Sequence, residues 1–316
     1  MEAAQVTAVI PTHNRAAFVG DAVQSLLDQT ASPESYRVLV VDNASSDGTR
    51  DLLQGRFGGY PRFTYVFEPV PGLSNAKNRA LRECATPAIA YMDDDATAAR
   101  EWVATVLAAF DSLPADVACV GGRVVARWEL PPPPWLPAEG RAMLSEIDFG
   151  EQPHYVTDGE YLGGGNSAFR AEALREAGGF SVHLGRRGKS LLSNEEILLR
   201  RQLAGRGYRY YYAPAMSILH FVPKERLTRK WLIRRAFWQG VSQQITRLAL
   251  GDVVTEREAS WRWRAWALRA GALHFLRIAR AWRSEDPEVF GLSLMRAQQV
   301  GDWFARAGFI KPGSYD

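Results

Sequence analysis

Cysteine and long apolar runs are scarce in this sequence, and each scarcity excludes a class of protein. The 316 residues include two cysteines, Cys84 and Cys119, which give neither a disulfide framework nor the spacing of a zinc site. No uncharged apolar run of roughly 18 residues occurs, so we expect no membrane-spanning helix. The N-terminus carries Glu2 and an early apolar strand instead of a basic and then apolar leader, so we expect no signal peptide. These features are typical of a cytoplasmic protein.

Two phosphate-binding motifs are missing as well. No Gly-x-Gly-x-x-Gly and no complete Gly-x-x-x-x-Gly-Lys-Ser/Thr segment occurs, which counts against dinucleotide-dependent dehydrogenases and P-loop enzymes. Hydrophobic residues make up 47% of the chain and charged residues 23%, as in ordinary globular proteins.

Charge and tryptophan are distributed unevenly along the chain. Residues 224–316 carry 17 Lys and Arg against 9 Asp and Glu, whereas residues 1–223 carry 21 against 26. Seven of the ten tryptophans also follow residue 223. We therefore expect an acidic domain over residues 1–222 and a basic, tryptophan-rich region over residues 223–316.

Three consecutive aspartates form the most informative stretch. Asp93, Asp94 and Asp95 directly follow the apolar run 88–92, which is typical of a buried strand. Adjacent carboxylates repel one another, and a divalent cation such as Mg²⁺ or Mn²⁺ would neutralise them. The alternative is an acidic turn that caps a helix starting near Thr97, because Asp is a good N-cap residue.

Strand and helix patterns alternate on the way to this stretch. Strand-like runs cover 6–10, 38–41, 63–67 and 88–92, with helical spacing of apolar residues between them. This alternation predicts an α/β fold with a mainly parallel sheet flanked by helices. Asp42 and the three aspartates both follow strands, so they should meet at the sheet edge where open α/β folds bind ligands. Lys77 and Arg79 open an intervening helix and could offset phosphate charge, as expected of a nucleotide site.

Four segments carry a family resemblance in their order and spacing. They are residues 9–15 (VIPTHNR), 41–49 (VDNASSDGT), 75–79 (NAKNR) and 93–95 (DDD). Together they resemble the successive signatures of family 2 glycosyltransferases, and the resemblance covers residues 5–222. It implies a GT-A fold, a Rossmann-like sheet that binds a nucleotide sugar with a divalent metal, here followed by a C-terminal helical extension.

The resemblance also implies roles for individual residues. Asp95 is the expected metal ligand, Asp93 is a second candidate ligand, and Asp93 and Asp94 would lie nearer the ribose and sugar. The remaining nucleotide-sugar contacts would come from Pro11, His13 and Asp42 at the base and ribose, and from Arg15 and Arg79 near the nucleotide.

His220 follows a strand-like run, at a position where some family members place a metal-binding histidine. A neutral imidazole is an acceptable ligand for Mn²⁺ beside carboxylates. A purely structural histidine is the alternative.

The glycine triplet 163–165 precedes another strand-like segment. Glycine lets backbone approach a ligand closely because it has no Cβ, although an isolated triplet also suits a flexible turn. By the resemblance, Gly164 and Gly165 border the sugar pocket.

Two glutamates occupy the expected start of a later helix. Glu195 and Glu196 follow Asn194, and acidic residues at a helix start are also explained by capping and the helix dipole. Their position matches the family's Glu-Asp pair, whose second carboxylate acts as the catalytic base. Glu196 stands at that second position with one more methylene than the usual aspartate, so Glu195 remains an alternative base.

The C-terminal region shows helical periodicity with basic borders. One apolar face contains Trp231, Trp238 and Val241, and a second helix contains Trp261, Leu268, Phe275 and Trp282. We interpret these helices as the acceptor side of the protein, with contact to another subunit or to the inner face of the cell membrane as alternatives. No nucleic-acid-binding signature accompanies the basic residues.

These features lead to one predicted function and two rivals. We expect an inverting, Mn²⁺- or Mg²⁺-dependent glycosyltransferase that moves a sugar from a UDP-sugar to a carbohydrate, lipid-linked or small-molecule acceptor. A sugar-nucleotide nucleotidyltransferase is one rival, but it normally needs a Gly-rich, Arg-containing loop where this chain has residues 11–14 (PTHN). The other rival is a non-catalytic carbohydrate-binding protein on a transferase fold.

Overall fold

The computed structural model describes residues 4–188 and 190–310. Within it the chain divides into two compact units, each described by itself. The first runs up to Arg127 and adds Glu146–Phe180 and Leu199–Phe221; the second contains Trp128–Ser145, Ser181–Leu198 and the chain from Val222 onward. The expected boundary after residue 222 lies next to the junction between Phe221 and Val222, although both units are discontinuous in sequence. The roles of the two expected domains stay predictions.

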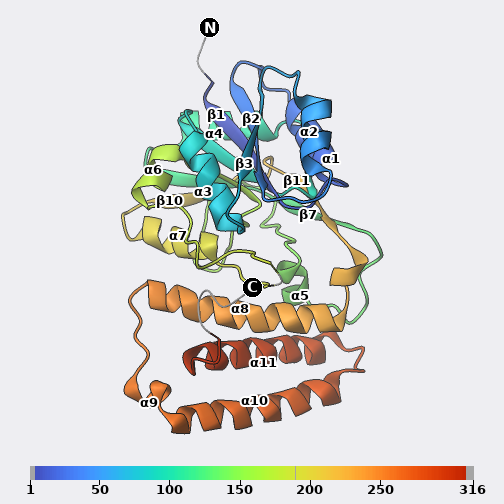
Figure 1. Ribbon diagram of the computed structural model, residues 1–316, viewed down its shortest axis with the longest axis vertical. Helices are drawn as coiled ribbons and strands as arrows, with labels where there is room; N and C mark the ends of the chain where they lie inside the picture. The colour runs from blue at the N-terminus through green and yellow to red at the C-terminus, as the bar shows by residue number, and fades with distance from the viewer. Residues whose placement is uncertain (1–3, 189, 311–316) are drawn as a thin grey trace. The chain divides into compact units, whose positions relative to one another are not determined.

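An eight-stranded mixed sheet forms the centre of the first unit (Figure 1). Strand β1 pairs in parallel with β2 and β4, β2 with β3, and β6 with β10, whereas β9 runs antiparallel to both β4 and β6. The expected α/β fold with a mainly parallel sheet is therefore confirmed, with β9 as an antiparallel insertion. The order is β3-β2-β1-β4-β9-β6-β10-β8, with bounds β1 Val6–Thr12, β2 Tyr36–Asn43, β3 Phe63–Glu68, β4 Ala88–Met92, β6 Val117–Gly121, β8 His154–Tyr155, β9 Asn166–Arg170 and β10 Arg209–Tyr212.

Helices cover both faces of this sheet, as Figure 1 shows. All seven residues of β1 are buried, and their side chains alternate between the two sides: Ala8 and Ile10 join one apolar cluster, and Val9 joins the other. A strand covered on both faces has no need of polar alternation, which explains the continuous apolar runs in the sequence. The helices are α1 Val19–Leu27, α2 Thr49–Phe57, α3 Leu73–Glu83, α4 Trp102–Ser112, α6 Ala171–Glu176 and α7 Glu195–Ala204, the last of which begins in the second unit.

A small three-stranded sheet lies next in sequence to the aspartates. It has the order β5-β11-β7, with bounds Ala96–Ala98, Ile218–Val222 and Val124–Trp128. Strand β5 starts directly after Asp95, and the following helix α4 begins only at Trp102. The alternative in which the aspartates cap a helix starting near Thr97 is therefore wrong.

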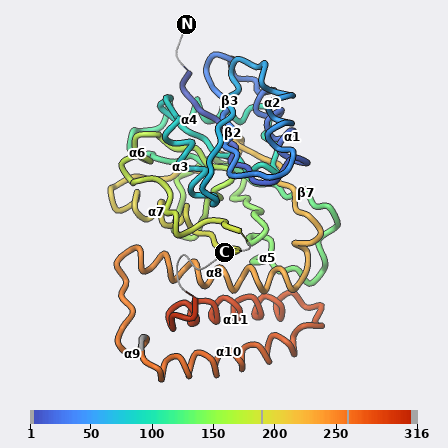
Figure 2. The backbone as a smooth tube through the Cα atoms, viewed as in Figure 1, coloured from blue at the N-terminus to red at the C-terminus, as the bar shows by residue number. Residues whose placement is uncertain are grey.

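Long helices dominate the second unit. Figures 1 and 2 show α11 between α8 and α10. The sequence patterns predicted two of these helices and missed α11, which Asp286 caps by accepting a hydrogen bond from the Glu288 backbone. The elements are α5 Ala138–Met143, the 3₁₀ turn η1 Lys224–Arg226, α8 Arg229–Ala249, α9 Glu256–Ala259, α10 Trp261–Ala281 and α11 Pro287–Arg306. Among the described residues, no helix is both long enough and apolar enough to cross a membrane.

Helices α8 and α11 approach closely because each presents a glycine to the other. A Cβ at Gly240 would lie 1.9 Å from the Gln298 carbonyl oxygen, and one at Gly301 would lie 1.9 Å from that of Phe237. Ion pairs add to this contact: Arg247 and Arg306 both reach Asp302, and Arg306 also pairs with Glu258 of α9. The pairing of small residues fixes how the two helices sit together.

We predict that Gly301→Ala lowers the free energy of unfolding by about 1–3 kcal/mol, because the added methyl forces the two backbones apart. Gly291→Ala in the same helix is the matched control, since its Cβ would meet its neighbours at an ordinary 3.5 Å or more. Relief of the glycine's low helix propensity should make that control neutral or up to about 1 kcal/mol more stable. Chemical denaturation measures both, and equal stability of the two variants would contradict the close contact.

Candidate active site

Asp93, Asp95 and His220 form a cluster of metal-ligand type in the first unit. One donor atom from each residue lies within 4.8 Å of those of the other two. His220 Nε2 is 3.2 Å from Asp95 Oδ1, and both side chains are buried. The pairing of β5 with β11 sets His220 opposite Ala96, and the Phe221 N–H donates to the Asp95 carbonyl at 2.8 Å. Strand pairing thus brings together residues that are far apart in the sequence.

The electrostatics of the cluster favour a bound cation. Burial, and then the negative charge of Asp95, raise the pKa of Asp94 to about 7, while Arg15 acts in the opposite direction. The Arg15 guanidinium lies 3.7 Å from Asp94 and 3.7 Å from Asp95. The raised pKa of Asp94 reflects the cost of burying negative charge at this place, and a bound cation would relieve that cost.

The donor set fits a divalent metal. Two carboxylates and one imidazole are suitable ligands for Mn²⁺, and the carboxylates also suit Mg²⁺. In the part of the chain that the structure describes, the buried Nδ1 of His220 has no hydrogen-bond partner, so no acceptor atom orients this ring from behind. The three residues expected from the sequence as ligands therefore lie together, and their role in metal binding stays a prediction.

Gly165 makes room for Asp93. The Asp93 N–H donates to the Gly165 carbonyl at 3.2 Å, and a Cβ at position 165 would lie 2.0 Å from Asp93 Oδ2. This close approach follows from the pairing of β4 with β9, in which Met92 faces Asn166. Gly164 precedes it in the same loop before β9. Steric demand explains Gly165 better than a flexible turn does.

Asn166, the next residue, was missed by the sequence analysis. Its fully buried amide donates to the carbonyls of Arg123 and Met216 at 3.0 and 2.7 Å. Its Oδ1 accepts from the indole N–H of Trp102 at 2.7 Å. Four segments therefore meet at one side chain next to the aspartates, and nothing in the local sequence pattern indicates this.

Asp42 is buried at the end of β2, with both carboxylate oxygens engaged. Its Oδ1 accepts from the Ser45 N–H at 3.0 Å, and its Oδ2 accepts from the Tyr65 hydroxyl at 2.7 Å. Arg50 donates to the same hydroxyl at 3.0 Å. Pro11 is buried opposite Val41 in the pairing of β1 with β2. Tyr65 and Arg50 were not singled out from the sequence, because neither belongs to a recognisable motif.

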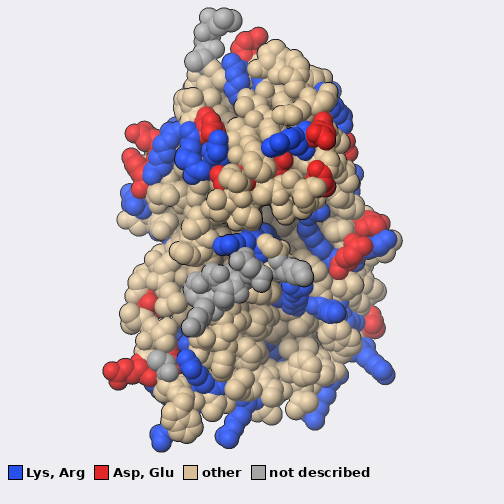
Figure 3. All heavy atoms as spheres, viewed as in Figure 1, with Lys and Arg blue, Asp and Glu red and all other residues tan. Residues whose placement is uncertain are grey.

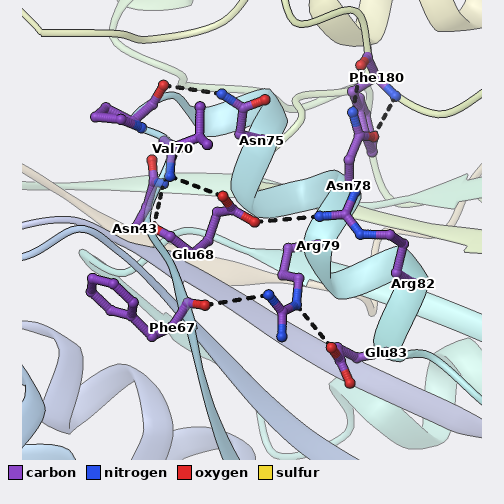
Figure 4. A network of polar contacts seen from close by, with 11 residues as sticks. Asn43, Phe67, Glu68, Val70, Asn75, Asn78, Arg79, Arg82, Glu83 and Phe180 are labelled. Atoms are coloured by element: carbon purple, nitrogen blue, oxygen red, sulfur yellow. Dashed lines mark hydrogen bonds and ion pairs between the residues drawn. The ribbon is translucent and has the colours of Figure 1, made fainter.

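Asn43 organises the loops beside Asp42, as Figure 4 shows. Its amide donates to the carbonyls of Glu68 and Val70 at 3.2 and 2.7 Å, and its Oδ1 accepts from the Gly72 N–H at 2.7 Å. Its own carbonyl lies 2.6 Å from Nδ1 of the exposed His13. One side chain thus ties the end of β2 to the loop between β3 and α3.

Arg79 points elsewhere. Its guanidinium contacts Glu83 at 2.8 Å and the Phe67 carbonyl at 3.5 Å (Figure 4). Among the described residues, Arg79 has no contact with the three aspartates, so the structure does not bring it to the cluster of candidate metal ligands. Its neighbour Asn78 instead holds the backbone of Phe180 through two hydrogen bonds of 2.7 and 2.8 Å.

The two candidate base residues belong to the second unit and begin α7. Glu195 is buried and Glu196 is partly exposed. Burial lowers the pKa of the Arg235 guanidinium in α8, and the charges of Glu196 and Glu195 oppose that shift. Arg235 donates to Gln239 at 2.8 Å and to the Ser193 hydroxyl at 3.3 Å.

Gln239 extends this network to the residue before α7, since its amide donates to Asn194 Oδ1 at 2.8 Å. Asn194 has a φ of 75°, a left-handed conformation that Asn tolerates better than most residues. The start of α7 is therefore held by side chains of α8, which the sequence did not predict.

The fold and the site together define a class of protein: an α/β scaffold with a cluster of metal-ligand type where β4 of the mixed sheet ends and β11 of the small sheet approaches it. The glycosyl transferase family 2 profile matches residues 7–177. The chain therefore belongs to glycosyl transferase family 2, and it is a glycosyltransferase.

Two relatives illustrate this membership. The chain is 27% identical over 261 residues to glucosyl-dolichyl phosphate glucuronosyltransferase from Haloferax volcanii, an alignment that covers 81% of each chain. It is 28% identical over 241 residues to pre-mycofactocin glycosyltransferase from Mycobacterium tuberculosis, covering 74% of this chain and 46% of that one. The chain thus spans less than half the length of the second relative.

A solved structure confirms the fold. The mannosyltransferase PcManGT from Pyrobaculum calidifontis, solved with GDP-Man and Mn²⁺, superposes with a TM-score of 0.62 at 22% identity, over 96% of this chain and 86% of that one. At this identity the likeness establishes the GT-A fold and not the donor.

We predict that Asp95→Asn and His220→Ala each weaken Mn²⁺ binding by at least about tenfold, because each removes a donor from the cluster. Asp111→Asn on the exposed side of α4 is the matched control and should bind as the unaltered protein does. Electron paramagnetic resonance of free Mn²⁺ gives the affinities. Unchanged binding by both cluster variants would place the metal elsewhere.

We also predict that Gly165→Ala weakens Mn²⁺ binding by about tenfold or more, because the new methyl displaces the Asp93 carboxylate. A Cβ at Gly159 would meet nothing within 4 Å, so Gly159→Ala is the control. The same resonance titration distinguishes them, provided that circular dichroism shows both variants folded. Equal affinities would show that Asp93 is not a ligand.

Proposed function

We propose that this protein is an inverting, metal-dependent glycosyltransferase that moves a sugar from a nucleoside diphosphate sugar to an acceptor hydroxyl. The single observation that supports this most is the Asp93–Asp95–His220 cluster, with Asp95 and His220 buried, at the sheet edge of a family 2 chain. Family membership supports sugar transfer, and the donor set supports the dependence on a metal.

The donor would bind along the edge formed by the ends of β1, β2 and β4. Pro11, His13 and Asp42 would contact the base and ribose, in line with the sequence resemblance. Arg15 already lies beside Asp94 and Asp95, where a diphosphate bound to the metal would carry its charge. Gly164 and Gly165 would let the sugar approach β9. For Arg79 we propose a weaker and indirect role, since its contacts with Glu83 and Phe67 hold it in place.

The metal would be held by Asp93, Asp95 and His220, with Mn²⁺ the better fit because of the imidazole. When bound, it supplies Lewis-acid stabilisation of the negative charge on the departing diphosphate. Arg15 would add a second positive charge at the same place.

Glu196 would act as the general base. Its carboxylate would accept the proton of the acceptor hydroxyl while that oxygen forms a bond to the anomeric carbon. The bond from that carbon to the diphosphate oxygen breaks on the opposite face, so one displacement inverts the anomeric configuration. The buried Arg235 lies close enough to Glu196 and Glu195 to interact with their charges, and it would help to hold these side chains in position.

UDP is the nucleotide that the sequence resemblance favours, and GDP is the alternative, because PcManGT was solved with GDP-Man. For the acceptor we propose a hydroxyl of a lipid-linked sugar. The name of the Haloferax relative, which aligns over most of both chains, supports that class over a free carbohydrate or a small molecule.

Calorimetric titration of UDP and of GDP, each with and without Mn²⁺, tests the donor class. Metal-dependent binding of one nucleotide supports a transferase with that donor. Absence of binding to both by the folded protein would contradict the proposal and favour a non-catalytic carbohydrate-binding protein. Turnover of a sugar phosphate and a nucleoside triphosphate would instead indicate a nucleotidyltransferase.

We predict that Glu196→Gln lowers the rate of sugar transfer by about 10²–10⁴-fold, because the amide cannot accept the proton. Nucleotide affinity should stay unchanged, since the substitution removes one charge and keeps the size of the side chain. Glu195→Gln is the matched comparison and should lose less activity. Donor hydrolysis or transfer assays measure the rates, and the reverse order of the two variants would assign the base to Glu195.

A further inference from the structure

Helix α10 exposes a continuous apolar stripe. Trp261, Leu268, Phe275 and Trp282, the residue that ends the helix, follow one another at seven-residue intervals, and their exposed fractions are 73%, 52%, 69% and 40%. Residues seven apart lie nearly above one another on a helix. The sequence pattern predicted an apolar face on this helix, and within the described chain its four large side chains remain exposed. Contiguous exposed apolar surface of this kind marks an interaction site.

A neighbouring part of the α10 surface is occupied by α11. Trp266 and His274 of α10 contact the Trp303 ring at centroid distances of 4.8 and 5.1 Å, and Gly271 lies against Phe304. The helix therefore has an inner face that holds it to its own unit and an outer apolar face. The exposed stripe is therefore not the surface by which α10 packs within its own unit.

A basic border accompanies the stripe. Helix α10 carries five arginines and no acidic residue. Arg262 and Arg269 each follow a stripe residue by one position, so they lie roughly 100° around the helix from the stripe. Within residues 4–188 and 190–310, none of the five arginines forms an ion pair, while Glu258 and Asp302 pair with Arg247 and Arg306 instead. Along the lower edge of Figure 3, over α10, the charged side chains in view are basic.

The charge pattern decides between two occupants of this face. A second copy of the chain would bring two arginine-rich borders without acidic residues against each other, which costs electrostatic free energy. An anionic phospholipid surface offers both an apolar layer and negative headgroups, and helices that lie in such a surface combine Trp, Phe and Leu on one side with Lys and Arg beside them. No helix of the described chain is apolar enough to span a membrane, so contact would be at the surface.

We propose that α10 lies in the plane of an anionic membrane surface, with Trp261, Leu268 and Phe275 in the boundary between headgroups and acyl chains and the arginines against phosphate groups. Tryptophan near both ends of the helix suits that boundary, because its ring is apolar and its N–H is polar. This docking surface is independent of the donor, the metal and the base. It would hold the enzyme where a lipid-linked acceptor is found.

Sedimentation of the full-length protein with vesicles tests the docking surface. The vesicles contain phosphatidylcholine alone or phosphatidylcholine with phosphatidylglycerol. We expect binding to the anionic vesicles, with a salt-dependent partition constant. The double substitution Leu268→Glu with Phe275→Glu should reduce that constant about tenfold or more, because it places two charges in the apolar stripe. Arg269→Gln with Arg280→Gln should reduce it about tenfold on anionic vesicles only.

Val125→Glu with Leu130→Glu is the matched control, since both residues are exposed apolar side chains outside α10. It should bind vesicles as the unaltered protein does. Circular dichroism and the titration of nucleotide with Mn²⁺ check that every variant is folded, and they also separate failure of this inference from failure of the proposed transferase function.

Three results would overturn the inference. The first is absence of binding to anionic vesicles by the unaltered protein. The second is equal binding by the Leu268→Glu, Phe275→Glu variant, and the third is indifference to phosphatidylglycerol and to the arginine substitutions. A dimer in solution that the stripe substitutions convert to a monomer, without vesicle binding, would assign the face to a second copy.

Discussion

The repulsion among three consecutive carboxylates is the constraint on which the first unit depends. Asp93, Asp94 and Asp95 follow a fully buried strand, so water cannot screen their charges well, and burial has already raised the pKa of Asp94. Arg15 lies beside two of these carboxylates. A divalent cation at this edge would lower the electrostatic cost of burying them, and the proposed metal site follows from this constraint.

Neighbouring elements hold this edge in place through backbone contacts more than through the motif residues themselves. Strand β11 sets His220 beside Asp95, β9 brings Gly165 against Asp93, and the Asn43 amide fixes the loop after β3. Each of these contacts joins segments that are far apart in the chain. A ligand cluster positioned in this way needs little rearrangement on binding, which is what selective stabilisation of a charged leaving group requires.

The second unit uses arginine in two contrasting ways. Arg235 is buried beside the glutamates at the start of α7, where its charge acts on groups inside the protein. The arginines of α10 instead face outward beside an apolar stripe, where they can act on an external anionic surface. The basic residues after position 223 therefore act in at least two different environments, although the composition alone indicates a single basic region.

Local sequence was enough to predict the alternating strands and helices up to β4, because side-chain periodicity acts over a few residues. The resemblance to the family named Asp93, Asp95 and His220 as candidate ligands, and their role in metal binding stays a prediction. Tertiary structure alone decided the antiparallel pairing of β9, the position of helix α11 and the hydrogen bonds that converge on Asn166. It also decided the contact of Arg79 with Glu83 and the exposure of the α10 stripe. Those depend on pairing between distant segments, because an apolar stripe has the same sequence pattern whether a partner helix covers it or not.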